Sequence, residues 1–200
     1  IIDAACAPFS LINNLHPASF SDFCCWSFDS MKIVCCGDGG AIYSKDPERV
    51  PEIRRRLYMG LNTVSGFKSS EEEEWWKFDS SGFFRRSIMN DISAAIGVAQ
   101  LRKLQYFLEK RSIIAATYDD VLSSSQELRI AAQDCNSSCR QSYYFYWVQF
   151  LHRQDRNYVS KALKDLGVYT TFRYYPIHNL SSRPKSLVAQ EFPIADIMSD

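Results

Sequence analysis

The stretch FCCWSFDSMKIVCCGDGGAIYS, residues 23–44, decides how this chain is expected to fold. Its first end, Phe23–Phe28, contains three aromatic residues, and its second, Ala41–Ser44, contains Ile42 and Tyr43, which is typical of strands. Between them lie Lys32 and the glycine-rich turn Gly37–Gly40, where the backbone can change direction sharply. The stretch therefore predicts two strands, with a lysine held rigidly between the first strand and the turn.

The sequence on either side adds a strand and two helical segments. Ile1 and Ile2 run into Asp3 like the end of a buried strand. An aspartate, a proline and a glutamate in succession predict a helix from Pro47 to about Met59, because they supply an N-cap and a favourable first turn. A longer helical region begins after Asn90 or Asp91, where apolar residues recur at helical spacing up to about Leu122.

A compact alternation of strand, helix and strand follows. We expect a strand at Ser142–Leu151, a helix at Arg156–Leu166 ended by Gly167, and another strand at Val168–Tyr174. This order of elements predicts an α/β or α+β protein. We place a domain boundary inside the long helical region, near Phe107.

Composition limits the classes of partner. Hydrophobic residues make up 46% of the chain, and 23 basic side chains balance 23 acidic ones, so nothing favours nucleic acid or an anionic membrane. We find no membrane-spanning stretch and no signal peptide. Seven cysteines, an odd number, do not form a disulfide framework and favour a cytoplasmic location. Cys135 and Cys139 lack a second ligand pair, so no metal site is predicted.

Two residues are candidates for chemistry from their positions alone. Lys32 lies where a side chain could be held over a cofactor, although most lysines are solvated surface charges. Asp3 ends a strand, where acids commonly cap loops. Neither position is decisive by itself.

Several segments together resemble the DegT/StrS family of sugar aminotransferases, which belongs to the fold type I, aspartate-aminotransferase-like superfamily of pyridoxal phosphate (PLP) enzymes. The resemblance rests on motifs that occur in the right order along the chain: Asp3-Ala4-Ala5, Trp26-Ser27-Phe28 with Lys32, Gly37-Asp38-Gly39-Gly40-Ala41, Met89–Gly97 with Gln100-Leu101, and Tyr169–His178. It implies an α/β fold, with the C-terminal part of the large PLP-binding domain (a mixed sheet with flanking helices) at residues 1–106. A smaller α+β domain, incomplete at its end, would occupy residues 107–200.

The resemblance also implies roles for single residues. Lys32 would form the Schiff base with the cofactor aldehyde and then move the proton as acid and base. Asp3 would pair with the pyridine nitrogen, which keeps that nitrogen protonated. Ser27 would help hold the cofactor phosphate. A serine that only stabilises a turn is the alternative for Ser27.

The chain departs from the family pattern at two positions. Cys6 occupies a place near the cofactor ring where many members carry His or Gln, and a thiol is a poorer hydrogen-bond donor. Arg86 aligns roughly with an Asn that reaches the phosphate in the neighbouring subunit, and a guanidinium can serve a phosphate as well. Arg85 is the alternative candidate for this phosphate contact, and both arginines could simply be a solvated basic pair. His178 and Tyr174 are expected near the substrate, although Tyr174 could equally be a core or rim aromatic.

The implied activity is transamination. An amino-acid donor, typically glutamate in the family, gives its amino group to a keto-sugar nucleotide for polysaccharide or amino-sugar biosynthesis, in a homodimer. Lys32 argues against the family branch that performs dehydration, because that branch lacks the lysine. A non-catalytic or regulatory PLP-binding relative is the alternative, which Cys6 keeps open.

A third possibility concerns completeness. Related proteins carry a phosphate-cradling loop before the Asp3 motif, and we expect these 200 residues to be a fragment of a longer product. Alone, they would form an incomplete sheet with exposed apolar edges and would have weak or no activity.

Overall fold

The computed structural model describes residues 1–61, 80–130, 138–172, 174–181 and 192–199. The chain forms two compact units. The first comprises Ile1–Asp119 and Asp134–Tyr146, and the second comprises Asp120–Gln133 and Trp147–Asp200. The first segment of unit 1 ends at Asp119, within the helical region in which we predict a domain boundary. The more exact position of that boundary, near Phe107, stays a prediction.

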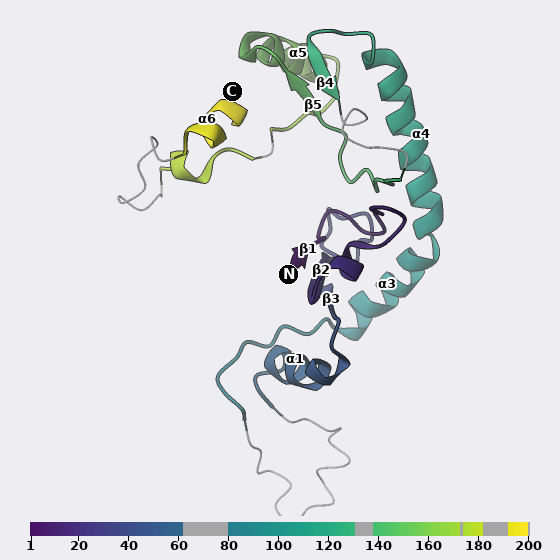
Figure 1. Cartoon of the computed structure of the whole chain (residues 1–200), viewed down its shortest axis with the longest axis vertical. Coiled ribbons are helices and arrows are strands. Elements are labelled where there is room, and N and C mark those ends of the chain that lie inside the picture. Colours follow the sequence, from purple (N-terminus) through teal and green to yellow (C-terminus); the bar gives the residue numbers. More distant parts are fainter. Residues whose placement is uncertain (62–79, 131–137, 173, 182–191, 200) are drawn as a thin grey trace, which may run out of the picture. The chain divides into compact units, whose positions relative to one another are not determined.

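A three-stranded mixed sheet lies in the first unit (Figure 1). It is built from β1 (Ile2–Asp3), β2 (Phe23–Ser27) and β3 (Gly40–Ser44), in that order. β1 pairs with β2 in parallel, and β2 pairs with β3 in the antiparallel direction. All three strands lie where the sequence predicts them.

Close approach of the backbones explains one glycine of the turn. Gly40 pairs with Ser27, and a Cβ added at Gly40 would lie 2.5 Å from the carbonyl oxygen of Trp26. No side chain fits at that distance, so glycine is needed where β3 begins beside β2.

The first predicted helix is present and begins as expected. Pro47–Arg49 forms a short 3₁₀ turn (η2) that continues into α1 (Val50–Leu57). The carboxylate of Asp46 accepts a hydrogen bond from the backbone N–H of Glu48 at 3.0 Å. Asp46 therefore caps the segment in the way that its position predicts.

The long helical region is one curved segment with a single interruption (Figure 1). It consists of α3 (Asp91–Arg102) and α4 (Leu104–Leu122), and the side chain of Asn90 caps its start by accepting from the backbone N–H of Ser93 at 2.9 Å. At Lys103 the backbone N–H bonds to the carbonyl three residues earlier, at 3.0 Å, which tightens the turn and separates the two helices.

The core of the first unit lies beneath the turn that carries Lys32. Ile33, Val34 and Cys36 are buried together with Leu104 from the start of α4. Partly buried residues pack around this cluster: Phe28, Met89, Phe107, Leu108 and Tyr144. Burial of the residues that follow Lys32 thus anchors its turn to the helix.

The second unit contains a two-stranded antiparallel sheet, β4 (Leu128–Ile130) and β5 (Val148–Phe150). The helix α5 (Arg153–Asp165) follows, and Gly167 just beyond it has a φ of +80°. The helix before Gly167 is confirmed. Short helical segments complete the unit: the 3₁₀ turn η4 (Ile177–Asn179) and α6 (Pro193–Ser199).

Two strand predictions need correction. The expected strand Ser142–Leu151 is reduced to β5, because Tyr143 has a φ of +50° and cannot continue a strand. The expected strand Val168–Tyr174 is wrong: among its described residues, 168–172 and 174, none pairs with another strand. An extended segment without a partner does not form a sheet.

Large apolar side chains remain exposed on α3 and α4, among them Ile92, Ile113 and Val121. The expectation of exposed apolar sheet edges stays a prediction, because these side chains lie on helices. Within the described residues, no helix combines the length and the apolar character needed to cross a membrane.

We expect Gly97→Ala to lower the free energy of unfolding, since an added Cβ would lie 2.9 Å from Sγ of Cys36. Overpacking of a core costs about 1–3 kcal/mol. Better helix propensity returns about 1 kcal/mol, so the net loss should be about 1 kcal/mol, measurable by urea unfolding. In a Cys36→Ala background the contact is gone and the substitution should become neutral or stabilising. An equal loss in both backgrounds would contradict this account.

Candidate active site

The carboxyl ends of β1 and β2 meet at one edge of the sheet. Asp3 pairs with Cys25 in the parallel register, so Asp3 and Ser27, which end these strands, leave the sheet on the same side. A carboxylate oxygen of Asp3 accepts from the backbone N–H of Ala5 at 2.9 Å, and Oγ of Ser27 accepts from the backbone N–H of Asp29 at 3.3 Å. Both predicted cofactor residues therefore begin loops at this edge.

A short turn after β2 carries Lys32. The backbone N–H of Lys32 donates to the carbonyl of Asp29 at 2.9 Å, and the backbone N–H of Cys36 donates to the carbonyl of Phe28 at 2.9 Å. The backbone N–H of Met31 bonds to the carboxylate of Asp29 and lowers the pKa of that carboxyl. These bonds hold the turn in one conformation and so fix the base of the lysine side chain.

The amine of Lys32 reaches the loop that follows β1. Its Nζ lies 3.1 Å from Sγ of Cys6, and both side chains are partly buried. Cys6 is three residues beyond Asp3, so this contact brings the lysine to the loop that begins at the carboxylate. The fold thus gathers four predicted site residues, Asp3, Cys6, Ser27 and Lys32, around one edge of the sheet.

One further neighbour of the amine was not predicted. Nζ of Lys32 lies 4.7 Å from the ring centroid of Tyr144, which the sequence placed inside a strand. No spacing or motif connects these two positions. Only the fold of the first unit brings them together.

Arg86 lies beside the end of α1. Its guanidinium carbon is 5.8 Å from the ring centroid of Tyr58, and these two residues form an isolated antiparallel bridge. The backbone N–H of Ser87 donates to the carbonyl of Leu57 at 2.8 Å. The side chains of Arg86 and Arg85 are both exposed, so exposure does not decide which of them would contact the phosphate.

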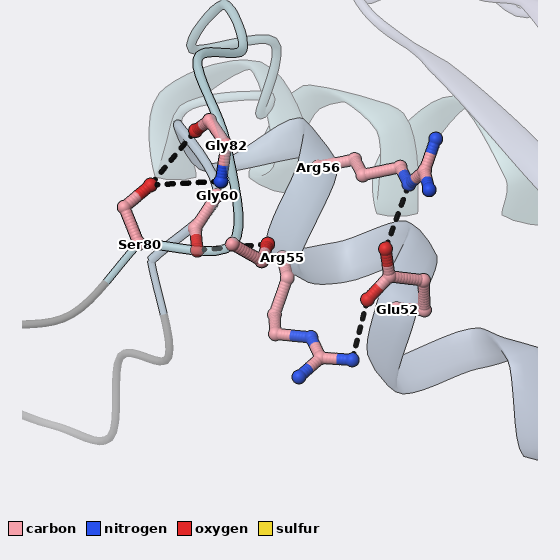
Figure 2. A network of polar contacts seen from close by, with 7 residues as sticks. Glu52, Arg55, Arg56, Gly60, Ser80 and Gly82 are labelled. Carbon is pink, nitrogen blue, oxygen red and sulfur yellow. Dashed lines mark hydrogen bonds and ion pairs between the residues drawn. The ribbon is translucent and has the colours of Figure 1, made fainter.

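The elements beside Arg86 are joined by a polar network (Figure 2). The carboxylate of Glu52 bonds to Arg55 and, at 2.8 Å, to Arg56, which leaves it shared between two guanidinium groups. These bonds lower the pKa of Glu52, with Arg56 as the largest cause. Oγ of Ser80 donates to the carbonyl of Gly82 at 2.7 Å. Oγ of Ser80 also lies 3.1 Å from the carbonyl oxygen of Met59, which ties the segment that leads to Arg86 to the end of α1.

His178 and Tyr174 belong to the second unit. The imidazole of His178 is buried, its Nε2 lies 2.8 Å from the carboxylate of Asp196, and its ring stacks on Phe192 at 4.9 Å. Asn179 donates to the same carboxylate oxygen at 2.8 Å. The side chain of Tyr174, by contrast, is 72% exposed.

Metal ligation finds no support where the structure is described: no three His, Cys, Asp or Glu side chains gather there as a metal site would require. Cys135 lies outside the described residues, and Arg173 of the C-terminal motif does as well.

Comparison with known proteins identifies the family. The model of the DegT/DnrJ/EryC1/StrS aminotransferase family matches residues 1–200. The chain belongs to this family. The match spans both units, including the sheet edge around Lys32 and the segment around His178.

Curated relatives of this DegT-family chain have names that refer to sugars. It is 40% identical over 183 residues to the dTDP-4-dehydro-2,3,6-trideoxy-D-glucose 4-aminotransferase of Saccharopolyspora spinosa. This alignment covers 90% of the chain and 46% of the relative. It is 26% identical over 199 residues to the GDP-perosamine synthase of Escherichia coli O157:H7, covering 98% of the chain and 49% of that relative. The chain therefore spans about half the length of these relatives.

Solved structures share the fold of this DegT-family chain. The aminotransferase TlmJ from Streptoalloteichus hindustanus is similar with a TM-score of 0.77 and 39% identity, over 90% of the chain and 46% of that protein. The PLP-form of Spr1654 from Streptococcus pneumoniae gives a TM-score of 0.84 at 21% identity, over 99% of the chain and 50% of that protein. The fold class is α/β, as the sequence predicts.

The pair of His178 and Asp196 should make stability depend on pH. The hydrogen bond to His178, and then that to Asn179, hold the pKa of Asp196 below its usual 3.8. The pairing therefore contributes stability above pH 3.8, and this contribution is lost as pH falls through the lower folded-state pKa. Thermal unfolding between about pH 2 and pH 6 should show a steeper loss for the wild type than for Asp196→Asn.

A matched control for Asp196 is Asp165→Asn, which changes an exposed carboxylate at the end of α5. The Asp165 variant should keep the wild-type dependence on pH. Parallel curves for wild type and the Asp196 variant would show that the pairing does not stabilise the second unit.

Proposed function

We propose that the protein is a PLP-dependent transaminase that transfers an amino group from glutamate to a keto-sugar nucleotide. One observation carries the proposal: the amine of Lys32 lies 3.1 Å from Cys6, in the loop that begins at Asp3. An amine, a carboxylate and a hydroxyl at one edge of a sheet match the aldehyde, the ring nitrogen and the phosphate of PLP. Family membership and the 40% identical relative support the same reaction.

The residues of the sheet edge fit the cofactor in kind. Lys32 would hold the aldehyde carbon through its ε-amine, Asp3 would hold the proton on the ring nitrogen, and Ser27 would donate a hydrogen bond to the phosphate. Cys6, beside the amine, would lie against the ring. When bound, PLP supplies an electron-accepting ring that stabilises the negative charge developed at the amino-bearing carbon.

Proton movement is assigned to Lys32. Its Nζ would take the proton from the amino-bearing carbon of the donor and return one when the keto-sugar is aminated. The turn held by Asp29 fixes the base of the side chain, so the amine can serve both steps from one position. Asp3 acts through charge, because an anionic carboxylate favours a protonated ring nitrogen.

The substrate side of the proposal rests on the second unit. Exposed Tyr174 would contact the sugar nucleotide, and His178 would shape the same region from its buried position against Asp196. The S. spinosa relative, named for a 4-dehydro sugar on dTDP, makes a 4-keto sugar on dTDP the first acceptor to test. A homodimer in the cytoplasm, with residues 1–106 in the large domain and 107–200 in the small domain, completes the proposal.

Borohydride reduction of the full-length protein with PLP should place a stable adduct on Lys32. Lys32→Ala should abolish that adduct, whereas Lys45→Ala, which changes an exposed lysine after β3, should leave it unchanged. Peptide mass spectrometry locates the modification. An adduct that persists in the Lys32 variant would defeat the proposal.

A turnover measurement distinguishes an enzyme from a protein that binds PLP without catalysis, the alternative that Cys6 leaves open. Glutamate added to the PLP-loaded protein should release one 2-oxoglutarate per site in a transaminase. A relative that only binds the cofactor would give the Lys32 adduct without any 2-oxoglutarate. The two measurements together distinguish binding from catalysis.

We expect Arg86→Ala to weaken PLP binding by roughly tenfold to a hundredfold, because a hydrogen bond from a charged donor contributes about 1.5–3 kcal/mol. Fluorescence titration measures the dissociation constant. Arg54→Ala, at an exposed arginine of α1, should leave affinity unchanged. A loss seen in Arg85→Ala instead would transfer the role to Arg85.

Mixed dimers test whether Arg86 acts across the subunit interface. A dimer of one Lys32→Ala subunit and one Arg86→Ala subunit contains a single site with both residues only if Arg86 reaches the partner's cofactor. Such a dimer should bind one PLP tightly. Absence of tight binding would place Arg86 in its own subunit's site, and unchanged affinity of the Arg86→Ala homodimer would place it outside the site.

A further inference from the structure

Tyr144 contacts the amine of Lys32, and the proposed mechanism gives it no role. The ring centroid lies 4.7 Å from Nζ, within the range in which an ammonium is attracted to the face of an aromatic ring. Tyr144 is partly buried and packs against the core cluster that contains Ile33 and Val34. Its ring also contacts Phe145 edge-on at 5.2 Å. Packing against the core cluster and Phe145 therefore holds the Tyr144 ring beside Lys32.

The segment before Tyr144 is hydrogen-bonded to the loop that carries Cys6. The buried side chain of Ser142 bonds to Oγ of Ser10 at 3.1 Å and to the carbonyl of Cys6 at 3.5 Å. Two backbone hydrogen bonds join Leu11 and Arg140, at 2.8 and 3.0 Å. Segments carrying Cys6 and Tyr144 are thus tied together on either side of the amine.

The backbone at this point is strained and is held by an arginine. Tyr143 has a φ of +50°, a conformation that costs a non-glycine residue about 1 kcal/mol or more. The guanidinium of Arg111, on α4, donates to the carbonyls of Tyr143 and Tyr144 at 2.8 and 3.2 Å. These two bonds stabilise the turn and set the direction in which Tyr144 leaves it.

We infer that Tyr144 is a positioning residue for Lys32, and that Arg111 positions Tyr144 in turn. The ring holds the amine beside Cys6, and the two bonds from Arg111 hold the turn that presents the ring. The inference rests on the proposed function for its catalytic meaning, because it concerns the amine assigned to PLP. Its structural content, an amine held between a thiol and a ring, does not depend on the cofactor.

The ring acts on the charged amine more strongly than on the neutral one. A tyrosine face is negative, so it attracts an ammonium, whereas it covers a neutral amine without charge attraction. Whenever Lys32 is not bonded to the cofactor, the ring would keep its amine within reach of the sheet edge. A leucine in place of Tyr144 fills similar space but lacks that attraction.

Competitive acetylation tests the inference without the cofactor. The full-length protein, treated with hydroxylamine to free Lys32, would be labelled with trace acetic anhydride, and labelling of Lys32 would be compared with that of exposed Lys45 by mass spectrometry. Only the neutral, accessible amine reacts. Tyr144→Leu should raise relative labelling of Lys32 by about twofold to thirtyfold, the range that cation–π attraction of this kind spans. Tyr144→Phe, which keeps the ring, should stay near wild type.

Two further variants locate the effect. Arg111→Gln removes the charged fork that holds the turn and should raise labelling of Lys32 in the same direction as Tyr144→Leu. Tyr106→Leu is the matched control, because Tyr106 lies 5.6 Å from Nζ of Lys110 on the same helix and does not belong to the site. It should leave labelling of Lys32 unchanged.

Folded Tyr144→Leu with wild-type labelling of Lys32 would overturn the inference, and so would Tyr144→Phe that labels like the leucine variant. If Tyr144→Leu does not fold, unchanged labelling in folded Arg111→Gln decides against it. The acetylation result is independent of the borohydride adduct. Failure of the inference and failure of the proposed function are therefore separate outcomes.

Discussion

Parallel pairing of β1 with β2 is the constraint on which the rest of the site depends. This register sets Asp3 opposite Cys25, so the loops after Asp3 and after Ser27 leave the sheet at the same edge. The turn after β2 then returns over a buried cluster and brings the amine of Lys32 to Cys6. A one-residue shift of β1 would turn the Asp3 side chain to the other face of the sheet and separate the carboxylate from the amine.

Local signals in the sequence were sufficient for the three strands and the long helices of the first unit. Aromatic strand residues, a glycine turn and two side-chain caps, Asp46 and Asn90, act within a few residues of the structure that they determine. The roles of Asp3, Ser27 and Lys32 came from a family resemblance, and the structure adds that their segments converge. The strand predicted at Val168–Tyr174 failed because a strand needs a partner, which composition does not reveal.

Tyr144 was beyond the reach of sequence reasoning for a related physical cause. Its neighbours in space are Lys32, at a separation of more than a hundred residues, and Arg111 on α4. The sequence around Tyr144 has the composition of a strand, and that composition conceals a turn with a positive φ at Tyr143. The hydroxyl of Ser10, which accepts from the backbone N–H of Ser142, and the remote guanidinium of Arg111 override local propensity here, because each satisfies a polar backbone group that a strand would have paired elsewhere.

The helix α4 explains why a segment so late in the chain contributes to the first unit. Arg111 holds the carbonyls of Tyr143 and Tyr144, and one turn after Ala115 the carboxylate of Asp119 accepts a hydrogen bond from the hydroxyl of Tyr146 at 2.7 Å. Burial, followed by that carboxylate, raises the pKa of Tyr146, which keeps the phenol a donor. Both anchors lie before the point at which α4 passes into the second unit. Residues 143–146 therefore contact α4, and the ring of Tyr144 lies beside Lys32, before the chain continues into β5.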